Sequence, residues 1–189
     1  DAMLASKEAY FLEVIVENLK IKQDLMVRID EIRKPNAIVA TNTSGIPVYS
    51  IAEGRSKEFK KHFLGMHFFN PPRYLKLLEI IPTADTSKDV VEAMARFGEY
   101  RLGKGVVLCK DTPNFIGNRV ALGTGAFAMD FILNNDYSVD EVDALTGPIM
   151  GRPKTATFRL IDLVGVDVWD HVGKNLAPLI PHDKLGQKY

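Results

Sequence analysis

The sequence predicts an α/β domain over residues 1–110, followed by an all-helical domain over residues 111–189. The apolar runs 9–16 and 37–42 flank a segment whose apolar residues have helical spacing, and this order is typical of a β-α-β unit in a parallel sheet. From residue 111 onward no strand pattern occurs. The sheet is therefore expected to end before the helical domain begins.

The remaining elements of the α/β domain follow from apolar spacing and from breaker residues. Residues 17–34 predict the connecting helix, which Pro35-Asn36 ends. Residues 62–69 and 75–82 are typical of two strands joined by a Pro-Pro turn, and we expect them to pair in the antiparallel sense. Four further segments complete the domain: a short helix-like stretch that ends at Ala52, a charged loop over 54–61, a helix over 87–100 and a last short strand over 105–110.

The second domain is predicted to hold one long helix and three shorter ones. The long helix covers residues 113–133 and begins at a proline. Its apolar residues surround more of the helix than one core-facing stripe needs, so we expect it to pack on a second surface as well. Ser138 begins the next helix, because a serine followed three residues later by Glu141 forms a capping box. Two further helices are expected over 155–163 and 167–176.

Composition excludes several classes of protein. With 46% hydrophobic and 25% charged residues, the chain is expected to be globular rather than disordered. Its 24 basic and 24 acidic side chains cancel, which argues against a nucleic-acid partner. No apolar run is long enough for a membrane span, and no signal peptide opens the chain. Cys109 is the only cysteine, so we expect a reducing location: the cytoplasm or, in a eukaryote, the mitochondrial matrix or the peroxisome.

Two apparent motifs carry no predicted site. Gly123–Ala128 fits the G-x-G-x-x-A pattern of a dinucleotide-binding turn, but it lies inside a predicted helix rather than after a strand. We interpret its small residues as a place of close helix packing. His62, His171 and His182 lack the spacing of metal ligands, and no metal site is predicted.

His67 and Glu79 lie on the two strands of the expected hairpin. If that hairpin is centred on Arg73, the two residues are directly opposed, with Cβ atoms about 4.5–5.5 Å apart on one face. A carboxylate beside an imidazole holds one tautomer and stabilises the imidazolium, as a general base requires. On this argument alone, a purely structural pair is the more common explanation.

Polar residues follow both strands of the β-α-β unit. Residues 40–45 have the sequence Ala-Thr-Asn-Thr-Ser-Gly, and Glu17-Asn18 holds the equivalent place after the first strand. Ligands of open α/β sheets bind at such strand ends, although a plain turn explains these residues as well. Residues 110–119 combine a turn, a proline and Asn118, and local chemistry indicates only a domain junction.

Taken together, these segments resemble the L-3-hydroxyacyl-CoA dehydrogenase family over nearly the whole chain. The segment GMHFFNPP, with Glu79 in the strand that follows, is the most specific. The order and spacing of all the segments are more specific than any one of them. The segments are VENLKIK (16–22), ATNTS (40–44), GMHFFNPP (65–72), KLLEII (76–81), KDTPNFIGNR (110–119) and LIDLVGVD (160–167).

The resemblance implies a Rossmann-type NAD-binding domain, followed by a helical domain for substrate binding and dimerisation. It implies that His67 is the catalytic base and that Glu79 is its partner carboxylate. Ser44 and Asn118 match polar residues around the reacting hydroxyl or carbonyl. The positions that match contacts of the nicotinamide-ribose half of NAD are Glu17, Lys22, Ser44 and Asn70.

The sequence departs from the family pattern in several places. The family's first β-α-β unit, with its Gly-rich phosphate-binding turn, would precede Asp1, so we expect a part of a longer protein that is by itself a poor enzyme. Gly45 stands where the family often has a second serine, and Asn114 replaces a usual glycine. Residues 151–165 resemble long multifunctional fatty-acid oxidation proteins that also carry an enoyl-CoA hydratase region.

The implied reaction is NAD-dependent oxidation of an L-3-hydroxyacyl-CoA to the 3-ketoacyl-CoA in fatty-acid β-oxidation, with an acyl-CoA thioester as substrate. We expect a homodimer, or contacts with neighbouring domains of a longer protein. One alternative is a 3-hydroxybutyryl-CoA dehydrogenase of short-chain metabolism. The other is a non-catalytic, crystallin-like structural relative, against which an intact His67–Glu79 pair argues.

Overall fold

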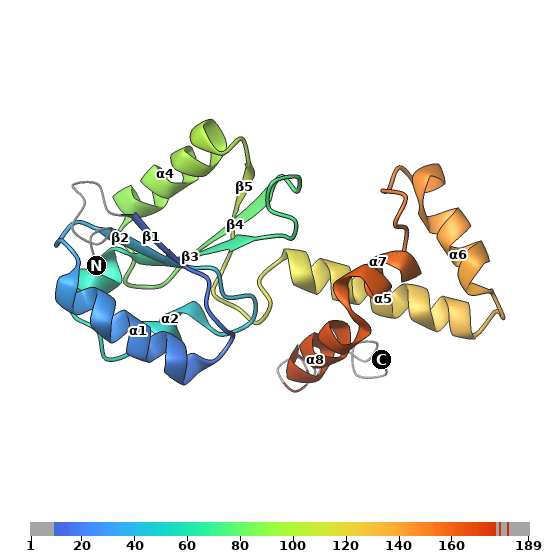
Figure 1. The fold of residues 1–189 in the computed structure, drawn as a ribbon, viewed down its shortest axis with the longest axis horizontal. Helices are drawn as coiled ribbons and strands as arrows, with labels where there is room; N and C mark the ends of the chain where they lie inside the picture. Colours follow the sequence, from blue (N-terminus) through green and yellow to red (C-terminus); the bar gives the residue numbers. More distant parts are fainter. Residues whose placement is uncertain (1–9, 177, 179–180, 182–189) are drawn as a thin grey trace. The chain divides into compact units, whose positions relative to one another are not determined.

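A computed structural model describes residues 10–176, 178 and 181 (Figure 1). The chain divides into two compact units, residues 1–116 and 117–189. The first holds the sheet, and the second holds helices only among its described residues. The predicted order of an α/β domain and a helical domain is therefore confirmed.

The first unit is built on a five-stranded sheet in the order β1-β2-β3-β4-β5. The strand pairs β1–β2, β2–β3 and β4–β5 are parallel, and β3–β4 is antiparallel. This confirms both the β-α-β unit and the hairpin that the sequence predicts. β1 occupies only part of the predicted run 9–16, of which residue 9 lies outside the described residues. The strands are β1 (Tyr10–Glu13), β2 (Ile38–Thr41), β3 (Phe63–Phe68), β4 (Leu77–Pro82) and β5 (Gly105–Leu108).

Helices cover both faces of this sheet (Figure 1). On one face α1 (Leu19–Ile32), α2 (Val48–Ile51) and α3 (Lys57–Lys61) pack against alternate strand residues such as Val39, Phe63 and Ile81. On the other face α4 (Lys88–Arg96) packs against the intervening residues, among them Leu64 and Ile80. α4 continues into a π-helical turn, η1 (Phe97–Arg101). Because strand side chains alternate between faces, the sheet carries two apolar cores.

The prediction of a charged loop over 54–61 was wrong, because α3 forms there. Ser56 caps this helix, with its Oγ accepting the amide N–H of Phe59 at 3.0 Å. Phe59 is fully buried, and its ring stacks on Phe63 with centroids 5.4 Å apart. One buried aromatic residue and one cap are enough to fix a single turn whose other residues are charged.

The second unit contains α5 (Gly117–Leu133), α6 (Val139–Thr146), a 3-10 turn η2 (Pro148–Met150), α7 (Phe158–Val164) and α8 (Val166–Leu176). The capping box at Ser138 is confirmed: its Oγ accepts the amide N–H of Glu141, and the Glu141 carboxylate accepts the amide N–H of Ser138. Asp143 is buried and accepts the amides of Thr157, Phe158 and Arg159 at the start of α7. Burial alone would raise the pKa of Asp143, but these hydrogen bonds lower it below its usual value.

The predicted start of the long helix at Pro113 was wrong, because α5 begins at Gly117. Asn114 and Phe115 have φ angles of 56° and 48°, in the left-handed region that a right-handed helix cannot include. The amide of Phe115 closes a turn on the carbonyl of Thr112 at 3.0 Å. A proline therefore precedes a left-handed turn here, and the helix starts after it.

The G-x-G-x-x-A match lies inside α5, as predicted, and forms no strand-helix turn. Close helix packing at its glycines is absent among the described residues, since a Cβ at Gly123 or Gly125 would meet no atom within 4 Å. Phe127 and Phe131 on the same helix are 65% and 52% exposed. Burial of this helix on a second surface stays a prediction.

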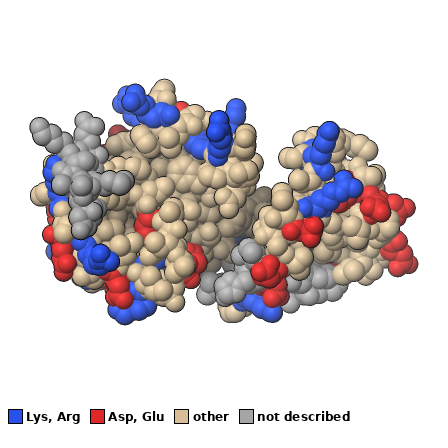
Figure 2. Space-filling view, in the orientation of Figure 1, with Lys and Arg blue, Asp and Glu red and all other residues tan. Residues whose placement is uncertain are grey.

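Charge is spread over the visible face of each unit (Figure 2). Acidic and basic side chains lie intermixed around α1 in the first unit, and intermixed again in the second. Among the described residues, no helix is long and apolar enough to cross a bilayer.

Gly65 of β3 lies against the side chains of Val48 in α2 and Ile81 in β4. A Cβ there would stand 2.9 Å from Val48 Cγ2 and 3.0 Å from Ile81 Cβ. We expect Gly65→Ala to lower the free energy of unfolding by roughly 1–3 kcal/mol through overpacking. Urea unfolding measures the change, with Gly105→Ala as the control because a Cβ there would meet only Lys76 O at 4.0 Å. Equal stabilities of the two variants would contradict the prediction.

Candidate active site

His67 and Glu79 form a buried pair on the two strands of the hairpin. They are direct partners in the β3–β4 register, which confirms the predicted opposition. His67 Nδ1 lies 2.7 Å from Glu79 Oε2, and both side chains are almost fully buried. The antiparallel register therefore brings an imidazole and a carboxylate together on the face covered by α1 and α2.

Glu79 is held in place from the segment that follows β5. Its Oε1 accepts the amide N–H of Ile116 at 2.9 Å, and the sulfur of Cys109 lies 3.4 Å from the same oxygen. Burial, the charge of Glu79 and the hydrogen bond to it raise the pKa of the Cys109 thiol to about 12. Cys109 therefore remains a protonated donor to the carboxylate and is not a nucleophile.

The imidazole of His67 is fixed between two aromatic rings. The ring of Phe69 lies 4.5 Å away and that of Phe115 lies 5.6 Å away, centroid to centroid, and both are tilted against it. Nδ1 is engaged with Glu79, whereas Nε2 has no hydrogen-bond partner among the described residues. A histidine oriented in this way presents one free basic nitrogen, which is the arrangement of a general base.

A second polar network joins the carboxyl ends of β1 and β2. Lys22 of α1 is only 1% exposed, and its Nζ donates to Glu13 Oε1 at 2.8 Å and to Ile15 O at 3.3 Å. Glu13, the last residue of β1, also accepts the hydroxyl of Thr41 at 2.6 Å. The buried ammonium thus has a buried carboxylate as its counter-ion, as burial of a charge requires.

Glu17 extends this network to the turn after β2. Its Oε2 lies 3.3 Å from Lys22 Nζ. Its Oε1 accepts the Thr43 hydroxyl at 2.6 Å and the amides of Ser44 and Gly45 at 2.9 and 3.1 Å. Burial alone would raise the pKa of Glu17, but these hydrogen bonds and the charge of Lys22 lower it below its usual value.

Most of the site residues proposed from sequence lie in these two networks. His67 and Glu79 form the first, and Glu17 and Lys22 form the second, with Ser44 on the turn that Glu17 holds. Asn70 is exposed beyond the end of β3. Asn118 belongs to the second unit, and its part in the site stays a proposal.

Sequence reasoning did not identify Glu13, Thr43, Cys109 or Ile116 as part of these networks. Glu13 left a signal, because it is the one charged residue in the apolar run 9–16. A carboxylate within a buried strand needs a partner, and Lys22 stands one helical turn into the following helix. The role of the Ile116 amide could not be predicted from the sequence, because a backbone N–H group does not depend on the type of residue that carries it.

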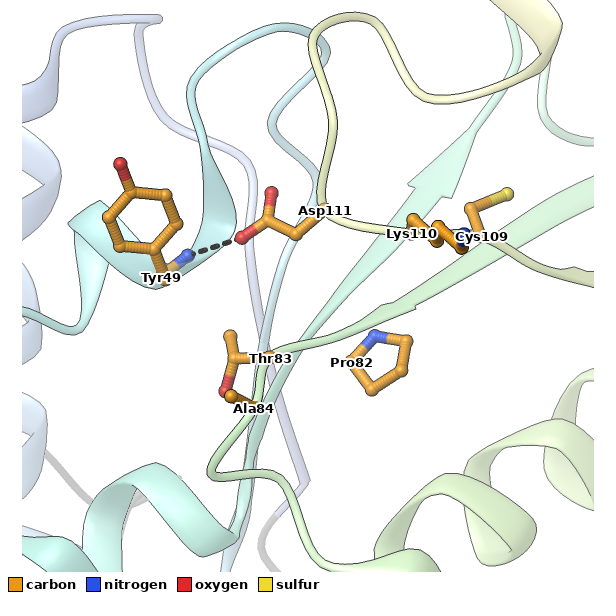
Figure 3. A pocket seen from close by; sticks show the side chains of 7 residues that line it. All are labelled: Tyr49, Pro82, Thr83, Ala84, Cys109, Lys110 and Asp111. Atoms are coloured by element: carbon orange, nitrogen blue, oxygen red, sulfur yellow. Dashed lines mark hydrogen bonds between the residues drawn. The ribbon is translucent and has the colours of Figure 1, made fainter.

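One cavity lies beside this region in the first unit, with a volume of about 470 Å³ (Figure 3). The Asp111 carboxylate at its rim accepts the amides of Val48 and Tyr49 at 2.9 and 2.8 Å. The Cys109 sulfur points away from Thr83 and Ala84. The lining residues are Tyr49, Pro82, Thr83, Ala84, Cys109, Lys110 and Asp111. Among the described residues, no cluster of three or more His, Cys, Asp or Glu side chains could hold a metal ion, and His182 lies outside them.

Comparison with known proteins assigns the family. Residues 2–112 match the NAD-binding domain of 3-hydroxyacyl-CoA dehydrogenases, and residues 115–188 match the C-terminal domain of the same enzymes. The chain therefore belongs to the 3-hydroxyacyl-CoA dehydrogenase family, which consists of NAD-dependent oxidoreductases. The resemblance drawn from the sequence is confirmed.

Three relatives illustrate the match. A probable 3-hydroxyacyl-CoA dehydrogenase of Bacillus subtilis is 52% identical over 93% of this chain, and one of Deinococcus radiodurans is 44% identical over 93%. The crystal structure of (S)-3-hydroxybutyryl-CoA dehydrogenase from Ralstonia eutropha superposes with a TM-score of 0.80 at 28% identity, covering 94% of this chain and 61% of that one. The chain spans 22% of the Bacillus relative and 51% of the Deinococcus relative.

The Glu13–Lys22 pair yields a stability prediction. Glu13→Gln should lower the free energy of unfolding by at most roughly 3–5 kcal/mol, because it removes the buried counter-ion of the Lys22 ammonium and leaves only the half-exposed Glu17 carboxylate beside it. The double variant Glu13→Gln/Lys22→Met should recover part of that loss. The control is Asp24→Asn on the same helix, whose exposed pair with Lys20 should contribute less than about 1 kcal/mol. Urea unfolding compares the variants, and additive losses in the double variant would argue against the pair.

Glu17 yields a prediction of pH dependence. Its folded pKa lies below the unfolded value of about 4.3, so its ionised form stabilises the fold above that pH. This contribution is lost as the pH falls through the lower, folded pKa. We expect the difference in unfolding free energy between the parent and Glu17→Gln to shrink steadily as the pH falls below about 4.3. Exposed Glu53→Gln is the control, and a pH-independent difference for Glu17→Gln would refute the assignment.

Proposed function

We propose that the protein carrying this chain oxidises an L-3-hydroxyacyl-CoA to the 3-ketoacyl-CoA with NAD, in fatty-acid β-oxidation. The observation that carries the proposal is the buried His67–Glu79 pair, whose imidazole Nε2 is engaged by none of the described residues, in a chain of this family. Its substrate is an acyl-CoA thioester with a hydroxyl group on C3. The single buried cysteine supports a reaction in a reducing compartment, inside the cell.

In this mechanism His67 acts as the general base. Its Nε2 accepts the proton of the C3 hydroxyl, while Nδ1 remains hydrogen-bonded to Glu79. The imidazolium formed in this step is stabilised by the adjacent carboxylate. Bound NAD would supply the acceptor for the hydride on C3. The amide of Ile116 and the thiol of Cys109 hold the carboxylate toward the imidazole throughout.

Glu17, Lys22, Ser44 and Asn70 are the residues that would hold the nicotinamide-ribose half of the cofactor. The donor set fits such a group, because the Glu17 side chain is 43% exposed and Ser44 and Asn70 are exposed at the carboxyl side of the sheet. Lys22 is buried beneath Glu17 and would act by holding that carboxylate and, through it, the turn at Ser44.

We propose that the helical residues 111–189 serve in substrate binding and dimerisation, with Asn118 as a polar residue that contacts the reacting hydroxyl or carbonyl. We propose a second copy of the chain, or neighbouring domains of a longer protein, as the partner of its exposed apolar residues. Phe127 and Phe131 support such a contact.

A short-chain substrate is the second candidate. The superposition on an (S)-3-hydroxybutyryl-CoA dehydrogenase supports this candidate. Initial rates with 3-hydroxyacyl-CoA substrates of increasing chain length separate the two candidates. A non-catalytic structural role is disfavoured by the fully formed dyad.

His67→Gln tests the proposed base. In the full-length protein that carries this sequence, we expect kcat to fall by about 10²–10⁴-fold while the affinity for NAD stays within about threefold. Glu79→Gln should act in the same direction but more mildly. His62→Gln is the matched control, because its Nδ1 contacts only the exposed Glu58 and its backbone carbonyl among the described residues. Steady-state kinetics measure the effect, and near-parental turnover of His67→Gln would remove this residue from the mechanism.

A further inference from the structure

Asn114 is a buried polar residue that the proposed mechanism does not use. It is only 5% exposed, and its φ of 56° places it in the left-handed turn before α5. Its side-chain amide makes no hydrogen bond to any of the described residues, and among these residues the fully enclosed side-chain polar atom without a partner is Trp169 Nε1 instead. The polar end of Asn114 therefore borders accessible space, where it can bind a polar group of a ligand.

The surroundings of Asn114 belong to the candidate active site. The next residue, Phe115, packs its ring against His67, and the amide of Ile116 donates to Glu79. The Asn114 amide itself is directed at Gly45, since a Cβ on Gly45 would stand 3.0 Å from Asn114 Oδ1. It therefore lies between the dyad-holding segment and the turn that carries Ser44.

Gly45 and Asn114 are complementary in space. A Cβ at position 45 would stand 3.0 Å from Asn114 Oδ1, which is tighter than ordinary contact, so the amide would have to shift to accept it. Both positions are among the departures from the family pattern noted above, with Gly45 in place of a serine and Asn114 in place of a glycine. Because the two residues adjoin, the two differences belong together. The polar group beside Ser44 is the amide of Asn114, which comes from the segment after β5, and not a side chain at position 45.

We propose that Asn114 is a substrate-binding residue, whose side-chain amide donates a hydrogen bond to the thioester carbonyl oxygen of the acyl-CoA. This inference rests on the proposed function. The thioester carbonyl is two carbon atoms from the reacting C3, so a donor that adjoins both the dyad segment and the Ser44 turn is suited to bind it. An amide donates without adding charge, as a neutral carbonyl requires.

The test uses the full-length protein and the variants Asn114→Gly, Gly45→Ser and their combination. Glycine keeps the left-handed backbone at 114 and removes only the amide. Asn114→Gly should raise KM for (S)-3-hydroxybutyryl-CoA about tenfold, the equivalent of about 1.4 kcal/mol, and leave KM for NAD unchanged. Asn114→Asp, which has no N–H donor at neutral pH, should raise it at least as much. The matched control is Asp136→Gly, another left-handed polar residue, in the exposed loop after α5.

The combined variant gives the sharpest outcome. Gly45→Ser alone should weaken substrate binding, because its Cβ would press on the Asn114 amide at 3.0 Å. With glycine at 114 the same serine should improve binding, since its hydroxyl then enters the vacated space. If Gly45→Ser changed substrate binding in the same direction in the parent protein and in the Asn114→Gly variant, the proposed complementarity would be overturned.

Two other results would overturn the substrate assignment. One is an Asn114→Gly variant that loses thermal stability but keeps its KM for the acyl substrate, which would make the amide a packing group. The other is a change confined to KM for NAD. Calorimetric titration with acetoacetyl-CoA measures the same interaction without turnover. If the parent protein bound this thioester but oxidised no 3-hydroxyacyl-CoA, the proposed function would fail, and the titration of Asn114→Gly would still decide the role of the amide.

Discussion

The antiparallel register between β3 and β4 is the constraint on which the candidate site depends. It sets His67 opposite Glu79 and Gly65 opposite Ile81, so the dyad and the close approach of α2 share one face of the sheet. A shift of one residue in one strand would turn its side chains to the other face, where α4 packs. The β4–β5 pairing then carries the chain to Cys109 and Ile116, which hold Glu79. One strand pairing thus determines both members of the dyad and the groups that orient them.

Carboxylates organise both networks of the first unit in the same physical way. Glu79 and Glu17 each accept backbone amides from a segment distant in sequence, and each also faces a basic side chain, His67 or Lys22. A charge-assisted hydrogen bond to an amide fixes a loop more firmly than a neutral one does. Carboxylates on a strand or next to one thereby hold loops that have no regular structure. These hydrogen bonds contribute to the rigidity of the site as much as the sheet does.

Much of this arrangement could be predicted from sequence, because its signals are local. The β-α-β unit follows from apolar spacing, and the opposition of His67 and Glu79 follows from a hairpin centred on Arg73. The errors arose where distant residues decide local conformation. α3 forms because Phe59 enters the core of the domain, and α5 starts late because Asn114 and Phe115 adopt a left-handed turn that their residue types do not signal. The complete burial of Lys22 was likewise hidden, since helical spacing marks a lysine as a surface residue.

The turn at Thr43 to Gly45 has an electrostatic property of its own. Successive backbone amides that converge at a turn usually make a concave site for anions such as phosphate. Here the Glu17 carboxylate already occupies that position, with the Ser44 and Gly45 amides and the Thr43 hydroxyl all directed to one of its oxygens. A carboxylate of the protein itself therefore takes the place of a bound anion. A ligand group that rests against this turn gains nothing from negative charge, and the remaining field of the carboxylate favours a group that is neutral or cationic.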